Sequence, residues 1–139
     1  MAAKDRFHDA VKLGLQKEQW TITHDPLKIE FGEDDVVEID LGAEQILGAE
    51  KAGKKIAVEI KSFLGESALY DFHTALGQFL NYRLVLEKSE PERILYLAVP
   101  LAAYESFFWR DLPQASLQLY QVKLIVYDPQ KEAIHKWCK

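Results

Sequence analysis

Three charged residues in the first half of the chain have types and a spacing that suit phosphodiester chemistry. Asp40 ends the alternating segment VVEID, and Glu59 and Lys61 lie two positions apart in AVEIKSF. On a strand, this spacing places both side chains on one face. Two converging carboxylates can hold a hard cation such as Mg²⁺, and a lysine beside them can orient water or offset charge in a transition state. The pattern therefore indicates a metal-assisted hydrolytic site.

Each of these residues also has a purely structural interpretation. Glu59 and Lys61 could form an incidental ion pair on the solvated face of an amphipathic strand, and Asp40 could bond the turn that follows it. From the triplet alone the structural interpretation is favoured, because Glu-x-Lys is common. For Asp40 the two interpretations are about even.

The hydrophobic pattern predicts the elements that must position these residues. Strands are expected at 20–24, 36–41, 46–51, 55–63, 93–99 and 122–127, with a short one over 132–137. Helices are expected near 7–15, over 67–87 and over 101–111, before an interruption at Pro113. Gly53 lies between the strands expected at 46–51 and 55–63 and is typical of a hairpin turn. The order predicts an α/β fold with a mixed central β-sheet flanked by helices.

Length and composition exclude several classes of protein. The chain has 139 residues, 48% of them hydrophobic and 28% charged, which suits a single domain over 1–139. A formal net charge of −5 excludes a uniformly basic nucleic-acid coat. The one cysteine, Cys138, excludes an intrachain disulfide and a Cys-rich zinc site. With no membrane-length apolar run and no signal-peptide core at the start, we expect a cytoplasmic protein.

A known nuclease signature resembles the charged constellation. Asp40 followed by Glu59-Ile60-Lys61 is similar to the PD-(D/E)xK motif of restriction-endonuclease-like folds. The resemblance implies that Asp40, Glu59 and the Ile60 carbonyl hold Mg²⁺ or Mn²⁺, and that Lys61 positions the attacking water. The sequence departs from the motif at Ile39, which replaces the proline.

The long helix predicted over 67–87 carries a second resemblance. Gln78 and Tyr82 lie four residues apart and hence on one face of that helix. They are similar to the Q-x-x-x-Y motif that follows the Glu-x-Lys strand in one branch of these nucleases. The resemblance implies that Gln78 orients Lys61 or a DNA phosphate and that Tyr82 supports it.

Other residues are alternative or weaker candidates. Glu44 lies in the segment between Asp40 and Glu59 and is the alternative metal ligand, although Asp40 is preferred because it ends an alternating strand. Asp9, next to His8 on the first helix, is a weak candidate, with a solvated helix face favoured. His73 could touch a phosphate, but a surface histidine is favoured. Three lysines lie near the predicted hairpin, namely Lys51, Lys54 and Lys55. They could contact a DNA backbone, or they could protect an edge strand from pairing with another chain.

Nearly the whole chain resembles the XisH family, the cyanobacterial fdxN-element excision controlling factors. The matching stretches recur in order and are AKDRFHDAVK, WTITHDPL, DLGAE, KIAVEIKSF, FHTALGQFLNYR, LYLAVPL and LIVYDP. The resemblance implies a role in a programmed DNA excision carried out by a site-specific recombinase. It also implies a small companion protein of the XisI type.

The sequence features are compatible with two functions. The first is a metal-dependent, endonuclease-like enzyme that acts on DNA. The second is a non-catalytic accessory factor that binds XisI, the excision recombinase complex or both, and the charge of −5 favours this alternative somewhat. A homo-oligomer is compatible with either function. The aromatic segment from Tyr104 to Trp109 is a plausible contact surface for such a partner. In a third interpretation the site is a relic, and the Glu59–Lys61 pair is structural.

Overall fold

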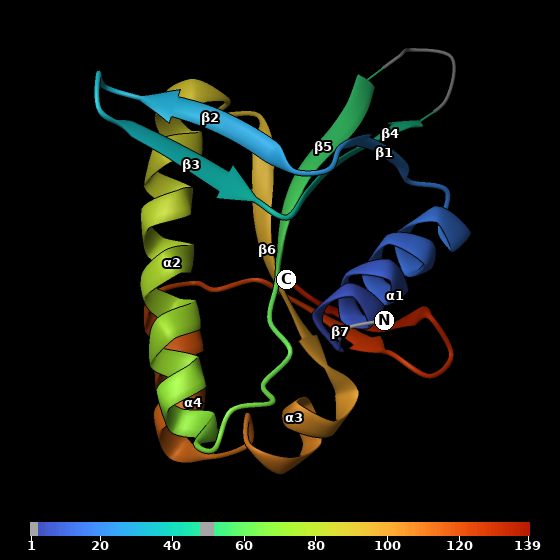
Figure 1. The fold of residues 1–139 in the computed structure, drawn as a ribbon, viewed down its shortest axis with the longest axis vertical. Coiled ribbons are helices and arrows are strands. Elements are labelled where there is room, and N and C mark those ends of the chain that lie inside the picture. The colour runs from blue at the N-terminus through green and yellow to red at the C-terminus, as the bar shows by residue number, and fades with distance from the viewer. Residues whose placement is uncertain (1–2, 48–51) are drawn as a thin grey trace.

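A mixed sheet of six strands occupies the centre of the fold (Figure 1). The computed structural model describes residues 3–47 and 52–139. In spatial order the strands are β1 (Thr21–His24), β4 (Leu41–Leu47), β5 (Ala52–Ile60), β6 (Arg93–Pro100), β7 (Leu124–Asp128) and β8 (Ala133–Cys138). The three inner strands β5, β6 and β7 are parallel, and the outer pairs are antiparallel. The near-continuous apolar runs of β6 and β7 are buried, as expected for parallel strands covered on both faces.

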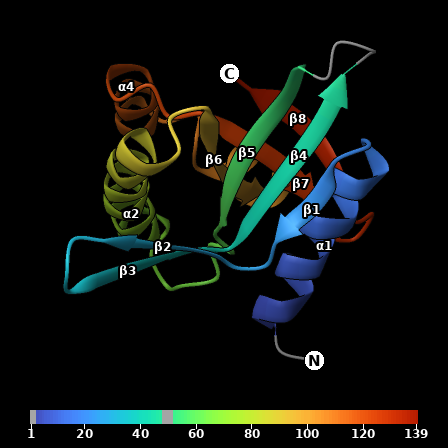
Figure 2. The same cartoon turned by 90° about the horizontal axis from the view of Figure 1, so that it is seen from above.

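Helices cover both faces of this sheet, which confirms the predicted fold class (Figure 2). On one face α1 (Ala3–Lys17) buries Phe7 and Leu15 against the sheet. On the other face α2 (Ala68–Ser89) buries Phe72 and Phe79. No helix within the described residues is long and apolar enough to cross a membrane.

A separate two-stranded ribbon lies over α2 and was only partly predicted. It consists of β2 (Leu27–Phe31) and β3 (Asp35–Ile39), and no strand was expected over 27–31. The strand expected over 36–41 is in fact two strands in different sheets. Ile39 packs in the α2-side core, whereas Leu41 packs in the α1-side core. Asp40 is therefore the residue at which the chain passes from the ribbon into the central sheet.

Local chemistry explains where the helices begin. The Ser67 hydroxyl accepts a hydrogen bond from the Tyr70 amide and caps α2. The helix predicted over 101–111 is divided into α3 (Leu101–Ser106) and α4 (Asp111–Leu119). Pro113 does not interrupt α4 but lies in its first turn, where the amide that proline lacks has no helical partner.

An antiparallel hairpin joins β4 and β5, but the strand expected over 46–51 instead runs over Leu41–Leu47, and the expected turn glycine is elsewhere. Gly53 lies within β5, opposite Ile46 in the strand register. Residues 48–51, which include Gly48 and Lys51, lie outside the described residues. Within β5, Ile56 and Val58 face the α1-side core while Ala57 faces the α2-side core, which is the predicted alternation.

Candidate functional site

Asp40 and Glu59 are brought together by two hydrogen bonds between backbone and side chain. The Ile60 amide donates to Asp40 Oδ2 at 2.7 Å. In return, the Asp40 amide donates to Glu59 Oε1 at 3.3 Å. Because Asp40 lies between β3 and β4 and Glu59 lies near the end of β5, these bonds join the ribbon to the central sheet. The two carboxylates predicted from sequence to converge do so.

Lys61 completes a compact charged group. Its Nζ lies 3.3 Å from Glu59 Oε2. Its backbone is held on both sides, because its amide donates to the Ala98 carbonyl at 3.0 Å and its carbonyl accepts from the Tyr127 hydroxyl at 3.2 Å. Lys61 therefore has a fixed backbone, whereas its side chain remains partly exposed.

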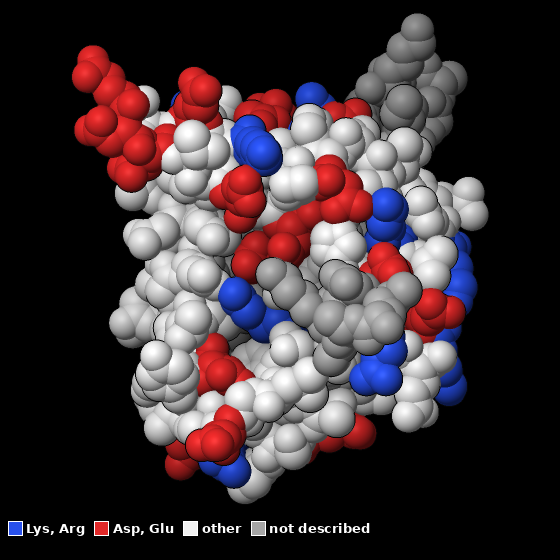
Figure 3. All heavy atoms as spheres, viewed as in Figure 1, with Lys and Arg blue, Asp and Glu red and all other residues white. Residues whose placement is uncertain are grey.

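The electrostatics of this group are dominated by the burial of Glu59. The residue is only 5% exposed. Burial first, and then the negative charge of Asp40, raise the pKa of Glu59 to about 7, although Lys61 opposes the shift. Figure 3 shows acidic side chains gathered across the middle of one face, where β3, β4 and β5 meet in Figure 1. A bound cation would relieve the repulsion between the two carboxylates.

The two predicted residues on α2 are placed toward the same face of the sheet as Glu59. Burial raises the pKa of Tyr82, and the nearby carboxylates of Glu59 and Asp40 raise it further. Gln78 Oε1 is buried, and among the described residues it accepts no hydrogen bond. An unpaired buried acceptor is costly, so this oxygen is available to a donor that the protein itself does not supply.

A cavity of about 230 Å³ opens beside the carboxylates on the α1 side. It is lined by Phe7, His8, Asp40, Ile60, Lys61 and Ser62. His8 Nε2 lies 2.7 Å from Asp25 Oδ1, which fixes the imidazole at the cavity wall. His8 is not among the site residues predicted from the sequence, because no local motif links α1 to residues far along the chain. Only the tertiary packing brings them together.

The residues present fit a hard divalent cation with few protein ligands. No group of three or more His, Cys, Asp or Glu side chains suited to a metal occurs among residues 3–47 and 52–139. Each of the two carboxylates retains lone pairs beyond those that accept the amide bonds. Mg²⁺ commonly takes one or two protein carboxylates and keeps several water or phosphate ligands. Asp40, Glu59 and the Ile60 carbonyl are suited to that coordination mode.

The other sequence candidates lie elsewhere. Glu44 Oε1 is 3.8 Å from Arg93 Nη2 and 3.9 Å from Lys55 Nζ. Because Glu44 lies opposite Lys55, it is four residues of β5, or about 13 Å, from the level of Glu59. His73 is exposed on α2, and Asp9 is half-buried on α1.

The comparisons with known proteins identify the family. The family model described as XisH protein matches residues 1–135. A solved XisH family protein from Nostoc punctiforme PCC 73102 is 47% identical, with a TM-score of 0.87 over 97% of this chain and 100% of that one. A solved fdxN element excision controlling factor protein from Anabaena variabilis is 49% identical, with a TM-score of 0.85 over 97% of this chain and 99% of that one. No curated protein matches. The chain belongs to the XisH family.

Proposed function

We propose that this XisH protein is a Mg²⁺- or Mn²⁺-dependent, endonuclease-like enzyme that acts on DNA phosphodiesters during the excision of a DNA element. The observation that carries the proposal is the convergence of Asp40 and Glu59, with Lys61 Nζ 3.3 Å from Glu59. Two neighbouring carboxylates, one of them the buried Glu59, are costly beside a single lysine as a purely structural device. The name of the Anabaena variabilis relative, an excision controlling factor, agrees with a role on DNA.

Each residue has a defined task in this proposal. Asp40, Glu59 and the Ile60 carbonyl would hold the cation, which when bound would polarise the phosphodiester and lower the pKa of a water molecule. Lys61 orients that water and offsets the charge that develops on the phosphate. Gln78, whose side-chain oxygen has no hydrogen-bond partner among the described residues, would orient Lys61 or a DNA phosphate once DNA is bound. Tyr82, four residues further along α2, would support Gln78 in this role.

A cleavage assay on linear and branched DNA with Mg²⁺ or Mn²⁺ tests this function. Lys61→Met should lower the rate by about 100-fold or more, because it removes the group that orients water while keeping a chain of similar length. The matched control is Lys28→Met on the exposed ribbon, where Lys28 makes only a 3.6 Å ion pair with Glu38. Full activity in the Lys61 variant, or cleavage that persists in EDTA, would contradict the proposal.

A second candidate function is that of an accessory factor that binds an XisI-type companion or the recombinase complex. Within the predicted aromatic segment Phe107 and Phe108 are buried, but Trp109 is 67% exposed. An exposed tryptophan is a typical anchor at protein interfaces. If this function holds, Trp109→Ala should abolish the capture of XisI in a pull-down, whereas Lys61→Met should not. Equal capture by both variants would remove Trp109 as the anchor.

A further inference from the structure

A second cavity, of about 390 Å³, lies at the other end of the parallel strands from the carboxylates. Its lining includes Ile56 and Ile94, which are paired near the starts of β5 and β6, whereas Glu59 and Lys61 are at the far end of β5. Ile56 belongs to the α1-side core, and Glu59 points to the opposite face. This cavity therefore lies on the α1 side of the sheet, as the smaller cavity does, but at the opposite end of the parallel strands.

Aromatic rings form the floor of this cavity. The Trp137 ring centroid lies 5.8 Å from that of Trp20 and 5.1 Å from that of Tyr96. Trp20 and Tyr96 are buried, and Trp137 is the ring that remains partly exposed. The indole N–H of Trp137 donates to Glu18 Oε1 at 2.8 Å, which fixes the orientation of the ring. The cavity thus presents one firmly held aromatic face.

Lysines form the rim of the cavity. The lining lysines are Lys54, Lys123 and Lys139. Lys139 Nζ lies 5.8 Å from the Trp137 ring centroid. Within the described part of the chain neither Lys123 nor Lys139 has an ion pair, and the only lining carboxylate is Glu18, which is bonded to Trp137. In a chain of net charge −5, this rim is a local concentration of positive charge.

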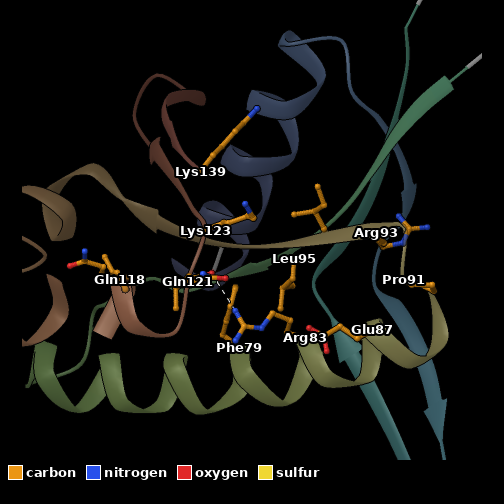
Figure 4. Close-up of a pocket in the computed structure, with 13 residues that line it drawn as sticks. Phe79, Arg83, Glu87, Pro91, Arg93, Leu95, Gln118, Gln121, Lys123 and Lys139 are labelled. Carbon is orange, nitrogen blue, oxygen red and sulfur yellow. Dashed lines mark hydrogen bonds between the residues drawn. The ribbon is translucent and has the colours of Figure 1, made fainter. Parts of the chain in front are cut away.

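The positive surface continues into a neighbouring groove of about 760 Å³ (Figure 4). The groove shares Lys123 and Lys139 with the aromatic cavity and adds Arg83. Figure 4 shows the two lysines on one side of β6 and Arg83 on the other. Arg83 Nη1 donates to the Tyr120 carbonyl at 2.6 Å, and Arg83 makes no ion pair within the described residues, although Glu87 one turn further along α2 also lines the groove. A negatively charged chain could therefore pass the starts of β6 and β7 from one cavity into the other.

We propose that this aromatic–lysine surface, comprising Trp137, Lys54, Lys123 and Lys139, binds single-stranded nucleic acid. A base would stack on the Trp137 ring, where it would replace Lys139, and the lysines would contact the flanking phosphates. An acidic protein segment would satisfy the lysines but would leave the aromatic floor without a role. This inference goes beyond the proposed cleavage of DNA and depends on none of its residues.

Fluorescence anisotropy of a labelled twelve-nucleotide oligothymidylate, in low salt and EDTA, tests the surface. The wild-type protein should bind, and Lys123→Glu combined with Lys139→Glu should weaken binding about tenfold or more. Losing two phosphate contacts should also make the log–log salt slope shallower by about 1.4. The matched control is Lys136→Glu, next to Trp137 on β8, whose ammonium lies 3.2 Å from the Tyr104 hydroxyl on the other side of the strand. No binding by the wild-type protein, or an equal loss in the control, would overturn the proposal.

Three further probes separate the ligand classes without another mutation: an abasic strand, polyglutamate and duplex DNA. An abasic strand of the same length should bind about tenfold more weakly, because base stacking contributes roughly 1–3 kcal/mol per base. Equal affinity for the abasic strand, for polyglutamate or for duplex DNA would overturn the assignment to single-stranded nucleic acid. Because this binding is measured in EDTA and the carboxylate site is tested by Mn²⁺ binding, a failure here is distinguishable from a failure of the carboxylate site.

Discussion

The backbone amide of Ile60 donates a 2.7 Å hydrogen bond to the side chain of Asp40. This bond places the carboxylate of one strand connection against the end of a parallel strand twenty residues further along the chain. It also makes Asp40 both a structural acceptor and a charged neighbour of Glu59. The two roles can be separated by substitution.

Asp40→Ala and Asp40→Asn should differ in stability. Alanine leaves the Ile60 amide without its acceptor, which costs about 1–3 kcal/mol, whereas asparagine retains an acceptor oxygen and removes the charge that opposes ionisation of Glu59. We therefore expect the free energy of unfolding in urea to fall for Asp40→Ala and to stay near the wild-type value for Asp40→Asn. Equal destabilisation by both would show that the hydrogen bond is not the structural role of Asp40.

The raised pKa of Glu59 predicts a specific dependence of stability on pH. The pKa is about 7 in the folded protein and 4.5 in its ordinary state, so folding favours the protonated carboxyl. The stability that the protonated Glu59 contributes is fully present below about pH 4.5. It is lost as the pH rises through 7, so that the free energy of unfolding falls by an amount on the order of 3 kcal/mol. Urea unfolding in EDTA at pH 5 and pH 8 measures it.

Glu59→Gln is the control for this pH dependence, because glutamine stays neutral throughout. The wild-type protein should lose more stability than the variant between pH 5 and pH 8. Identical losses in the two proteins would contradict the assignment of the raised pKa to Glu59.

Two glycines on helices provide a matched test of packing. A Cβ at Gly14 would lie 3.0 Å from the Ile134 backbone nitrogen, so α1 approaches the β8 backbone closely at this point. A Cβ at Gly77 on α2 would meet nothing within 4 Å. Thermal unfolding should show that Gly14→Ala destabilises the protein and that Gly77→Ala stabilises it by about 0.5–1 kcal/mol. A neutral Gly14→Ala would mean that α1 and β8 separate easily.

Arg93 should be the most sensitive charged residue outside the site. Its side chain is 2% exposed, donates to the Ile56 carbonyl at 2.9 Å and pairs with Glu90 at 3.0 Å. Arg93→Met should lower the free energy of unfolding in urea by about 3 kcal/mol. It leaves the buried Ile56 carbonyl without its donor and the Glu90 carboxylate without its ion-pair partner. Lys28→Met, which breaks only an exposed pair, should cost less than about 1 kcal/mol. Similar costs for both would contradict a buried role for Arg93.

Much of the fold could be predicted from periodicity. The buried runs of β6 and β7, the alternation of β5 and the length of α2 follow directly from apolar spacing. The break at Asp40 could not be predicted, because alternation from Val36 to Leu41 is the same whether a strand continues or passes into another sheet. The ribbon strand over 27–31 was missed because it is short and its burial depends on α2.

The candidate site was predictable in part for a similar reason. Residue types and the spacing of two in Glu59 and Lys61 identified the charged pair, and the end of an alternating segment identified Asp40. The position of His8 depends on how α1 packs across the sheet, and the unpaired oxygen of Gln78 depends on the surroundings of α2. Neither property is local in sequence.

The most direct test of the central claim is calorimetric titration of the protein with Mn²⁺ at pH 8, where Glu59 is ionised. The account predicts that the wild-type protein binds the ion, that Asp40→Asn and Glu59→Gln do not, and that Glu44→Gln binds as the wild type does because Glu44 pairs with Arg93 and Lys55. No binding by the wild-type protein, or binding lost in Glu44→Gln and retained in Glu59→Gln, would contradict a metal site at Asp40 and Glu59.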